Sequence, residues 1–534
     1  MASSLLDIPP ELIRKIIFLA DAPLGIPSIF QPLLLTCRYT YSILSAPETY
    51  SQLFVTHFDV PPPSVVDETT FRQHAKCEMV RRYITLRTLH QGQVDSENVL
   101  DVLWCALSMF GYSAVGQKNI KLLLQAGVSE FLISFIVSRL YDASGDNDGW
   151  PIENEANCLA VLLLWVSTSR FMIDGENPAT RRTLMNCLRP LVFAPYRYSI
   201  STVPEQLFLP EKWASAPAPR SIRSHWSCGA YGPPGLRLLE ARYFGDKFQK
   251  IQLPPITLLA TLAYFARQNF DRLVIPDQLP RTRLEANSLG LSGPTREDLE
   301  YFADHRTYCC GLESLRFCVA VRGIAPPYLP GTLTGRYNGS CLIPDRSQYD
   351  RWKSSASPPS PLELEAVSRR PFYVTLQEHV CYNIDQVIPK DASENGNMNA
   401  WLPSGFKWTE TVCFSQNGIM AFDTSETFKT FYQTYDASCA PQRKIVDVIV
   451  TGKTEPRHAA AWGDFNFIGR IRLADGLITL KRISVSNLGD TILRGKLTST
   501  HNFVGRMKPV STGFEPSIWE APFSLSKIHS RPLL

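Results

Sequence analysis

The sequence predicts an α+β multidomain protein with an N-terminal helical hairpin, a central all-α domain and a C-terminal antiparallel β-barrel-like domain. Two features of the sequence lead to this prediction. Before Tyr328, apolar residues recur mostly at helical spacing, whereas after it they alternate along short segments that contain glycine. The length of 534 residues is sufficient for about two to four domains. We therefore expect domains at 1–60, 65–325 and 326–515, followed by a C-terminal tail at 516–534.

The N-terminal stretch is predicted to form two short apolar helices. Pro10 suits the first turn of a helix, because a missing N–H costs nothing there. A second helix is expected from about Pro32 to Leu44. Sixty residues bury only about 60% of their unfolded surface, so part of this apolar surface is expected to need a partner. The apolar residues at helical spacing in the first helix are Leu12, Ile13, Ile16, Ile17 and Leu19.

This stretch resembles the F-box, a helical motif with a Leu/Ile-Pro-x-Glu opening and an Ile-rich first helix. In the F-box, an apolar run then ends in a small residue plus Arg, and an aromatic residue closes the motif. The connection Asp21–Gln31 is longer than is usual in that family, and Tyr50 and Phe54 stand where a late Trp is common. The residues that match the motif lie in order along the chain: Ile8, Pro9, Glu11, Leu12, Ile16, Leu19, Leu33, Cys37, Arg38, Leu44 and Phe54.

The resemblance implies a partner, because F-box segments dock on the Skp adaptor, which links them to a cullin-type ubiquitin ligase. A protein of this kind performs no chemistry; it holds a protein substrate, here unidentified, near the ubiquitin-charged enzyme. The alternative is an ordinary N-terminal hairpin packed on its own chain. The resemblance implies the following Skp-adaptor-binding residues: Ile8, Pro9, Glu11, Leu12, Ile16, Leu19, Leu33, Cys37, Leu44 and Phe54.

Helical spacing continues through the central domain. Val80, Tyr83, Ile84 and Leu86 are expected to form one apolar face. A stretch rich in Pro, Ser and Arg near 200–235 is expected to be a loop insertion. An armadillo-like helical stack is one option, although no fixed repeat period is present. Helices are expected near 71–140 with a break at Ala126-Gly127, and at 153–171, 178–191, 236–244, 256–268 and 295–303.

Strand patterns dominate the C-terminal domain. In the clearest hairpin, the alternating strand from Phe465 returns after Asp475-Gly476, a pair that supplies the two positive φ angles of a type I′ turn. A Phe-x-Gly-Arg unit occurs twice, at 467–470 and 503–506, and its glycine lets strands curl. These features predict a small closed or half-closed antiparallel barrel. Other strands are expected at 333–342, 372–382, 445–451, 492–497 and 503–507, with a polar loop at 392–405.

A second resemblance covers roughly the last two hundred residues. The stretch Asp447–His458, continuing through Trp462–Arg470 to Asp475–Ile478, is similar to the C-terminal region of uncharacterised basidiomycete (mushroom-type) fungal F-box proteins. It implies a shared module and brings no known ligand.

The composition argues against several classes of protein. A net charge of +4 is too small to indicate nucleic-acid binding by itself. The N-terminus has no basic stretch before a long apolar core, so no signal peptide is expected. The most apolar window, 158–166, is about half as long as a membrane span, so no membrane contact is expected. Scattered cysteines without a Cys-x-x-Cys pair fit a reducing compartment, the cytoplasm and/or the nucleus.

No catalytic or cofactor motif is evident. The chain has no Gly-x-Ser-x-Gly elbow, P-loop, His-Glu-x-x-His pair or dinucleotide glycine fingerprint. His305 precedes Cys309-Cys310 at a spacing that zinc can use, but a second ligand pair is missing. We therefore expect a non-catalytic protein without a metal or cofactor.

Basic residues accumulate in the predicted barrel, where eight Arg and Lys face only two Asp between Phe465 and Lys508. Arg470 and Arg472 lie two apart, hence on one face of their strand. Such a face could bind an acidic or phosphorylated segment through bidentate contacts; the alternative is a solvated outer face whose charges protect strand edges. The candidate substrate-binding residues are Arg470, Arg472, Arg494, Arg506 and His458.

Three functions remain open on the sequence. The first is a substrate-receptor subunit of a Skp–cullin–F-box ubiquitin ligase. The second is a small-ligand-binding β-barrel or interaction protein without a ligase role, in which the N-terminal helices pack internally. The third is an enzyme whose site carries no recognisable motif.

Overall fold

The structure is a computed structural model. It describes residues 8–20, 24–61, 63, 66–111, 117–142, 144–194, 197–200, 238–245, 247–269, 273–304, 311, 328–355, 358, 367–389, 399–413, 416–424, 427–436, 444–473, 475–498, 501–510 and 519–528. The insertion predicted near 200–235 and the group His305, Cys309 and Cys310 lie outside these residues, apart from Ile200.

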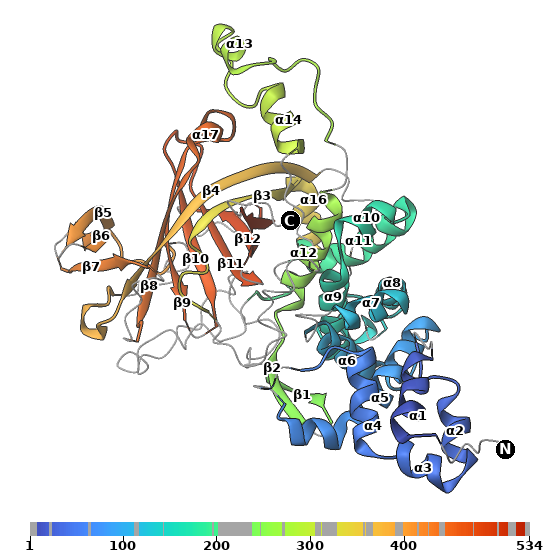
Figure 1. Cartoon of the computed structure of the whole chain (residues 1–534). Helices are drawn as coiled ribbons and strands as arrows, with labels where there is room; N and C mark the ends of the chain where they lie inside the picture. Colours follow the sequence, from blue (N-terminus) through green and yellow to red (C-terminus); the bar gives the residue numbers. More distant parts are fainter. Residues whose placement is uncertain are drawn as a thin grey trace.

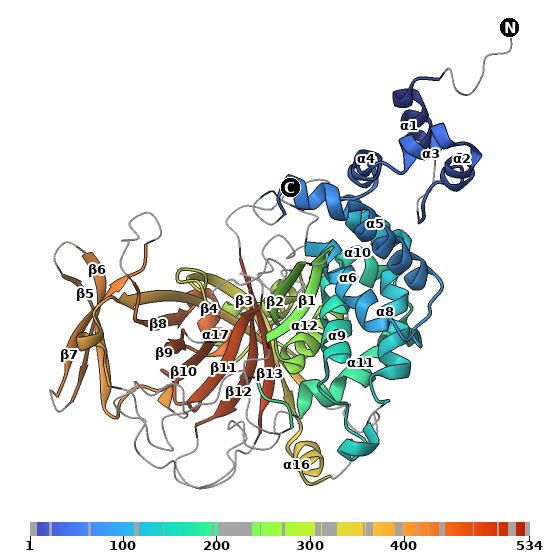
Figure 2. The ribbon, with the colours of Figure 1, turned by 90° about the horizontal axis from the view of Figure 1, so that it is seen from below.

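The fold is α+β, with helices in the N-terminal half and an antiparallel β-barrel at the C-terminal end, as predicted. In Figure 1 the helical body and the barrel lie side by side, and the first helices lie on the far side of the helical body from the barrel. Figure 2 shows the same arrangement from below, with α1, α2 and α3 projecting beyond α5.

Four short helices form the N-terminal unit where a hairpin was predicted: α1 (Pro10–Leu19), α2 (Phe30–Thr36), α3 (Arg38–Leu44) and α4 (Pro47–His57). The predicted second helix is interrupted at Cys37, whose φ of −160° and ψ of 169° are extended. Cys37 instead begins α3, and its sulfur accepts a hydrogen bond from the Thr40 backbone N–H. Pro32 sits in the first turn of α2, where its missing N–H has no intrahelical acceptor to lose.

The helical body is built around α9, which is buried along nearly its whole length because α6, α8 and α12 pack against it. The break between α7 and α8 falls at Gly127, as predicted, with a φ of 75°. Tyr83 and Leu86 are buried as expected, but Val80 and Ile84 on the same helix are exposed. The helices are α5 (Glu68–His90), α6 (Val99–Gly111), α7 (Lys118–Gln125), α8 (Val128–Arg139), η2 (Ser144–Asn147), α9 (Glu155–Ser167), α10 (Arg170–Gly175), α11 (Pro178–Phe193), α12 (Ile256–Gln268), α13 (Arg283–Ser288) and α14 (Arg296–Asp304).

The helix predicted at 236–244 is wrong. The segment forms a hairpin of β1 (Leu238–Phe244) and β2 (Lys247–Gln252). Gly245 supplies the turn with a φ of 57°, and Phe244 at the end of β1 is buried against Phe54 and Phe71. Packing against a distant part of the chain therefore decides the local conformation.

The barrel has eight strands in the order β3-β13-β12-β11-β10-β9-β8-β4, and the pairing of β3 with β4 closes it. Its inward-facing side chains form one apolar cluster that includes Tyr337, Phe372, Phe467 and Phe523. The strands are β3 (Gly335–Pro344), β4 (Val367–Cys381), β8 (Asp447–Thr454), β9 (Phe465–Arg472), β10 (Leu477–Ser484), β11 (Thr491–Thr498), β12 (Asn502–Pro509) and β13 (Ala521–Lys527).

Strand β13 lies in the stretch that the sequence predicted as a C-terminal tail, so that prediction is wrong for 521–527. Without β13 the barrel would be open, because this strand joins β12 to β3. Its residues from Ala521 to Ser526 are buried, which is the burial expected of an internal barrel strand.

Three further strands extend from the end of β4 and cover part of the barrel's outer face (Figure 1). They are β5 (Phe406–Cys413), β6 (Gln416–Asp423) and β7 (Lys429–Thr434). The polar loop predicted at 392–405 is wrong for Ala400, Trp401 and Leu402, which are buried; Ala400 and Leu402 pack in the apolar cluster beneath this extension. The remaining short elements are α16 (Arg346–Ser354), η8 (Ile384–Gln386) and α17 (Pro456–Trp462).

The predicted hairpin around Asp475 is present, because β9 pairs with β10 and Leu477 lies opposite Arg472. The turn differs from the predicted type I′, since Gly476 has a positive φ, of 71°, but Asp475 does not, and four residues join the strands. Among the described residues no single helix is long and apolar enough to cross a membrane; the bent pair α7–α8 passes that test by length and composition only.

Gly469 belongs to the first of the two Phe-x-Gly-Arg units and packs against the neighbouring strand. A Cβ at this position would lie 1.9 Å from the Thr479 carbonyl oxygen. Gly469→Ala is expected to destabilise the chain by about 1–3 kcal/mol, because the strand must shift to admit the methyl group. Urea unfolding measures this, with Gly175→Ala as the control, because nothing lies within 4 Å of the Cβ position there. Equal stability of the two variants would contradict the close packing.

Candidate functional site

The first helix presents two different apolar faces. Ile13 and Ile17 are buried against α3 and α4. On the opposite face Leu12 is 50% exposed, Ile16 49% and Leu19 75%. Their spacing of four and three residues places them in one stripe along the helix. A short helix that is buried on one side and apolar on the other has the pattern of a segment with a missing partner.

Neighbouring helices add exposed apolar residues that the sequence comparison with the F-box did not single out. Leu35 on α2 and Tyr41 on α3 are both mostly exposed. We call the set Leu12, Ile16, Leu19, Leu35 and Tyr41 the N-terminal apolar surface. The other motif residues flank it: Pro9 and Glu11 are exposed, whereas Ile8, Leu33 and Cys37 are partly buried.

Leu44 and Phe54, which were predicted to bind the adaptor, are fully buried and unavailable to a partner. The prediction is wrong for both, because they belong to the internal core of the unit. Phe54 lies at the centre of an aromatic cluster, with ring centroids 5.2 Å from Phe58 and 5.4 Å from Phe71. Apolar character alone could not distinguish these core residues from the exposed ones.

Polar contacts hold the four helices in this arrangement. Thr49 at the start of α4 donates a hydrogen bond to the Ile43 carbonyl at 2.7 Å and accepts one from Arg14 Nε at 3.1 Å. The Tyr39 hydroxyl donates to the Ile8 carbonyl at 3.0 Å. These bonds connect α1 to both α3 and α4, so the exposed stripe is carried on a fixed support.

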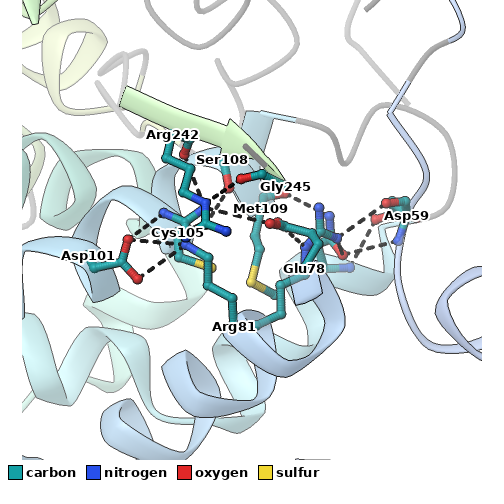
Figure 3. A network of polar contacts seen from close by, with 11 residues as sticks. Asp59, Glu78, Arg81, Asp101, Cys105, Ser108, Met109, Arg242 and Gly245 are labelled. Carbon is teal, nitrogen blue, oxygen red and sulfur yellow. Dashed lines mark hydrogen bonds and ion pairs between the residues drawn. The ribbon is translucent and has the colours of Figure 1, made fainter. Parts of the chain in front are cut away.

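A buried polar network joins this unit to the helical body (Figure 3). Arg82 on α5 donates to Glu78 at 3.1 Å, and its guanidinium lies 4.6 Å from the Phe54 ring centroid. Asn119 accepts from the Asp59 backbone N–H at 3.1 Å, and its own N–H donates to the Asp59 carboxylate at 2.9 Å. The segment that follows α4 is therefore bonded to α5 and to α7.

The neighbouring Arg81 extends the same joint. Its guanidinium donates to Asp101 on α6 at 2.8 Å and to the Arg242 carbonyl on β1 at 3.1 Å, as Figure 3 shows. Asp59, Glu78, Arg82 and Asn119 are all buried. One feature of the sequence indicates this joint: Glu78 and Arg82 are four residues apart, the spacing of an ion pair on one face of a helix.

The joint yields a stability prediction. Arg82→Met is expected to destabilise the chain by about 3–5 kcal/mol, because it removes the only hydrogen bond that the described residues make to the buried Glu78 carboxylate and leaves it with the Arg81 guanidinium 3.7 Å away. The matched control is Arg72→Met on the same helix, where the pair with Glu68 is exposed and the expected change is below about 1 kcal/mol. Urea unfolding checks both values, and an Arg82 variant as stable as the Arg72 variant would refute a structural joint here.

The four candidate arginines predicted to form a basic surface on the barrel are buried. Arg470, Arg472, Arg494 and Arg506 are each at most 2% exposed. Both alternatives drawn from the sequence, a binding face and a solvated face, are wrong for these four side chains. They do point outward from the barrel, but other parts of the chain cover them.

Arg470 joins β9 to the strands and loops that lie over it. Its guanidinium makes two hydrogen bonds to Asp447, at 2.7 and 2.9 Å, and donates to the Ile388 carbonyl at 3.1 Å. The Tyr432 hydroxyl on β7 donates to the same carboxylate at 2.7 Å. The pair is thus bonded on both sides, which is what a buried ion pair needs to repay its desolvation.

Arg506 joins the barrel to the helical body. Its guanidinium donates to the carbonyls of Leu191 and Val192 and to the Thr257 hydroxyl. Leu191 and Val192 are in the last turn of α11, where carbonyl groups lack intrahelical partners and the helix dipole favours a cation. Burial lowers the pKa of Arg506 to about 10.

Arg472 and Arg494 both lie over the Trp401 ring, with guanidinium carbons 5.9 and 5.5 Å from a ring centroid. Arg472 also makes two hydrogen bonds to Asp475, at 2.6 and 2.8 Å, and Lys496 lies 3.3 Å from the same carboxylate. Burial raises the pKa of Asp475, but the charge of Lys496 and the bonds from Arg472 outweigh it and hold the pKa below 3.8.

This pKa shift gives a pH dependence. A carboxyl group with a lowered folded-state pKa stabilises the fold fully above its unfolded pKa, and the stabilisation is lost as the pH falls through the folded value. Wild type should therefore lose more stability below pH 3.8 than Asp475→Asn does. Urea midpoints from pH 7 to about 2.5 measure the difference. Asp95→Asn is the control, since Asp95 is exposed. Its urea midpoint should fall with pH as that of wild type does. An Asp475→Asn variant with the same pH dependence as wild type would contradict the account.

His458, predicted to be a substrate-binding residue, lies in the short helix α17 and is buried. Its ring stacks on Tyr373 with centroids 3.6 Å apart, and Tyr301 of α14 lies 5.2 Å away. Burial lowers the pKa of the His458 imidazole. The residue therefore packs α14 and α17 on the barrel and is not brought together with the four arginines.

Within the described ranges, no group of three or more His, Cys, Asp or Glu side chains is placed to hold a metal ion. Comparisons with protein-family models, with curated proteins and with solved structures find no match to this chain. The N-terminal apolar surface is therefore the candidate functional site, on its own geometry and on the motif that it carries.

Proposed function

We propose that the chain is a substrate-receptor subunit of a Skp–cullin–F-box ubiquitin ligase and docks the Skp adaptor through the N-terminal apolar surface. The observation that carries the proposal is the exposed stripe Leu12, Ile16 and Leu19 on α1. These are motif residues, and they are the ones left uncovered while Ile13 and Ile17 between them are buried.

The energetics of docking favour this surface. Fully burying an aliphatic side chain contributes about 1.5–3 kcal/mol, and α1 alone offers three that are about half exposed or more. Glu11 and Lys15 beside the stripe are exposed and can form a polar rim. Leu35 and Tyr41 on the adjacent helices are further apolar contacts for the same partner.

The downstream domains would then present the target protein. In this role the chain performs no chemistry: it holds the target near the ubiquitin-charged enzyme, which is catalysis by proximity. The joint around Arg82 supports the role, because a receptor works by fixing the distance between its two partners. A cytoplasmic and/or nuclear location belongs to the same proposal.

Co-expression with the Skp adaptor tests the proposal. The wild-type chain should form a stable one-to-one complex on size-exclusion chromatography. Leu12→Asp with Ile16→Asp should weaken binding at least about 100-fold, because two charges replace buried aliphatic groups. The free energy of unfolding of the double variant should stay within about 1 kcal/mol of wild type, since both side chains are exposed.

The control is Val80→Asp with Ile84→Asp. This pair has the same spacing on α5, similar exposure at 39% and 54%, and the same change in charge. It should bind the adaptor like wild type. Two results would contradict the proposal. In the first, the wild-type chain is monodisperse alone and does not bind the adaptor. In the second, both double variants lose binding equally.

A further inference from the structure

Figure 1 shows α17 at one end of the barrel. Arg482 is near that end of β10, because it pairs with Phe467 of β9, close to the start of the strand that follows α17. Arg482 follows Ile478 and Leu480 at the inward-facing positions of β10. Its guanidinium carbon is 3.3 Å from the Phe465 ring centroid and 4.9 Å from that of Phe372. Phe372 is on β4, which β8 and β9 separate from β10, so the side chain reaches across the lumen.

Arg482 has no partner of opposite charge among the described residues. It forms no ion pair there, and its Nε is buried without a hydrogen-bond acceptor. Arg482 as a whole is partly buried. The fully buried Arg470 and Arg472 differ, since each bonds a carboxylate. Burial, followed by the nearby positive charge of Arg370, lowers the pKa of Arg482 to about 10. A cation removed from water needs compensation, and two aromatic faces supply only part of it.

A second orphaned polar group lies beside it. Thr491 on β11 is directly opposite Arg482 in the strand register. It is two residues from Leu493 of the interior cluster and therefore faces inward as well. The Thr491 hydroxyl is buried and has no hydrogen-bond partner among the described residues. A guanidinium and a hydroxyl without partners thus converge from neighbouring strands.

A second guanidinium approaches from the far wall. Arg370 is two residues before Phe372 on β4 and lies opposite Cys341 of β3. Burial raises the pKa of the Cys341 thiol to about 11, against the opposing effect of the positive charges on Arg482 and Arg370. Both guanidinium groups are therefore close to that thiol. At this end of the barrel the partly buried Arg482 and the exposed Arg370 lie near the aromatic rings of Phe372 and Phe465.

We propose that this end of the barrel binds a small organic carboxylate. The carboxylate accepts hydrogen bonds from the guanidinium of Arg482 and from the Thr491 hydroxyl, Arg370 adds a second positive charge, and Phe372 and Phe465 contact the apolar part of the molecule. Guanidinium and carboxylate match as a planar bidentate pair. This site is separate from the N-terminal apolar surface and would add a small-molecule ligand to the proposed receptor.

Calorimetric titration of the full chain with phenylacetate, benzoate and hexanoate tests the site. At least one of these should bind saturably at one site per chain. Phenylacetamide, which has the shape of phenylacetate without its charge, should not compete. Arg482→Gln should weaken binding by about tenfold or more, because it removes a charge-assisted bidentate contact.

Two further variants separate binding from folding. Thr491→Val should weaken binding by about threefold while leaving the urea midpoint unchanged or higher, because the hydroxyl satisfies no partner within the described chain. Lys481→Gln is the charge-matched control, since Lys481 is the next residue on the strand and pairs with Asp490; it should bind within about twofold of wild type.

Three results would overturn the proposal: no saturable binding of any of the three carboxylates, equal binding of phenylacetamide and phenylacetate, or unchanged affinity in both the Arg482 and Thr491 variants. If Arg482→Gln fails to fold, Thr491→Val decides, because that substitution keeps the side-chain volume nearly constant.

Discussion

The buried guanidinium of Arg82 is the contact on which the arrangement of the N-terminal helices depends. It packs on Phe54 and Phe58 of α4 and bonds Glu78 of its own helix. Because a buried charge without its partner is costly, the ion pair with Glu78 and the two aromatic rings favour this arrangement. Arg506 has the same role at the other end of the helical body, where it bonds the last carbonyls of α11. Two buried arginines thus connect the N-terminal unit, the helical body and the barrel.

This connection between the N-terminal unit and the barrel supports the proposed receptor role. A ligase subunit acts by holding two partners at a fixed separation, so a rigid path between its docking surface and its target-binding domains favours that role. The path runs from Phe54 through α5, α6 and α9 to α12, which packs on the barrel. On this account the exposed stripe of α1 is available to a partner, while the buried Leu44 and Phe54 maintain the shape of the N-terminal unit.

The sequence predicted the elements with a strong period. The α7–α8 break at Gly127, the helix at 256–268 and most barrel strands follow directly from local patterns. The sequence patterns did not predict the elements that form through contacts between distant parts of the chain. The hairpin at 238–252 forms because Phe244 meets Phe54, and β13 is needed only because the barrel must close.

The candidate sites show the same limit, because local patterns do not reveal which distant parts of the chain cover a residue. Alternation along β9 predicted that Arg470 and Arg472 share one face of their strand, but alternation does not tell whether that face meets water. The covering groups, such as Val192 and Ile388, lie far away in the sequence. For α1, the motif identified the residues that are exposed, because the partner that it implies requires them to be uncovered.

Hydrogen–deuterium exchange of the full chain with and without the Skp adaptor tests the central claim most directly. The account predicts that the adaptor slows amide exchange in 10–44, which comprises α1, α2 and α3, and leaves the barrel strands unchanged. Unchanged exchange in α1 together with protection in β5–β7 or the barrel would contradict it, because the adaptor would then be bound somewhere other than the N-terminal apolar surface.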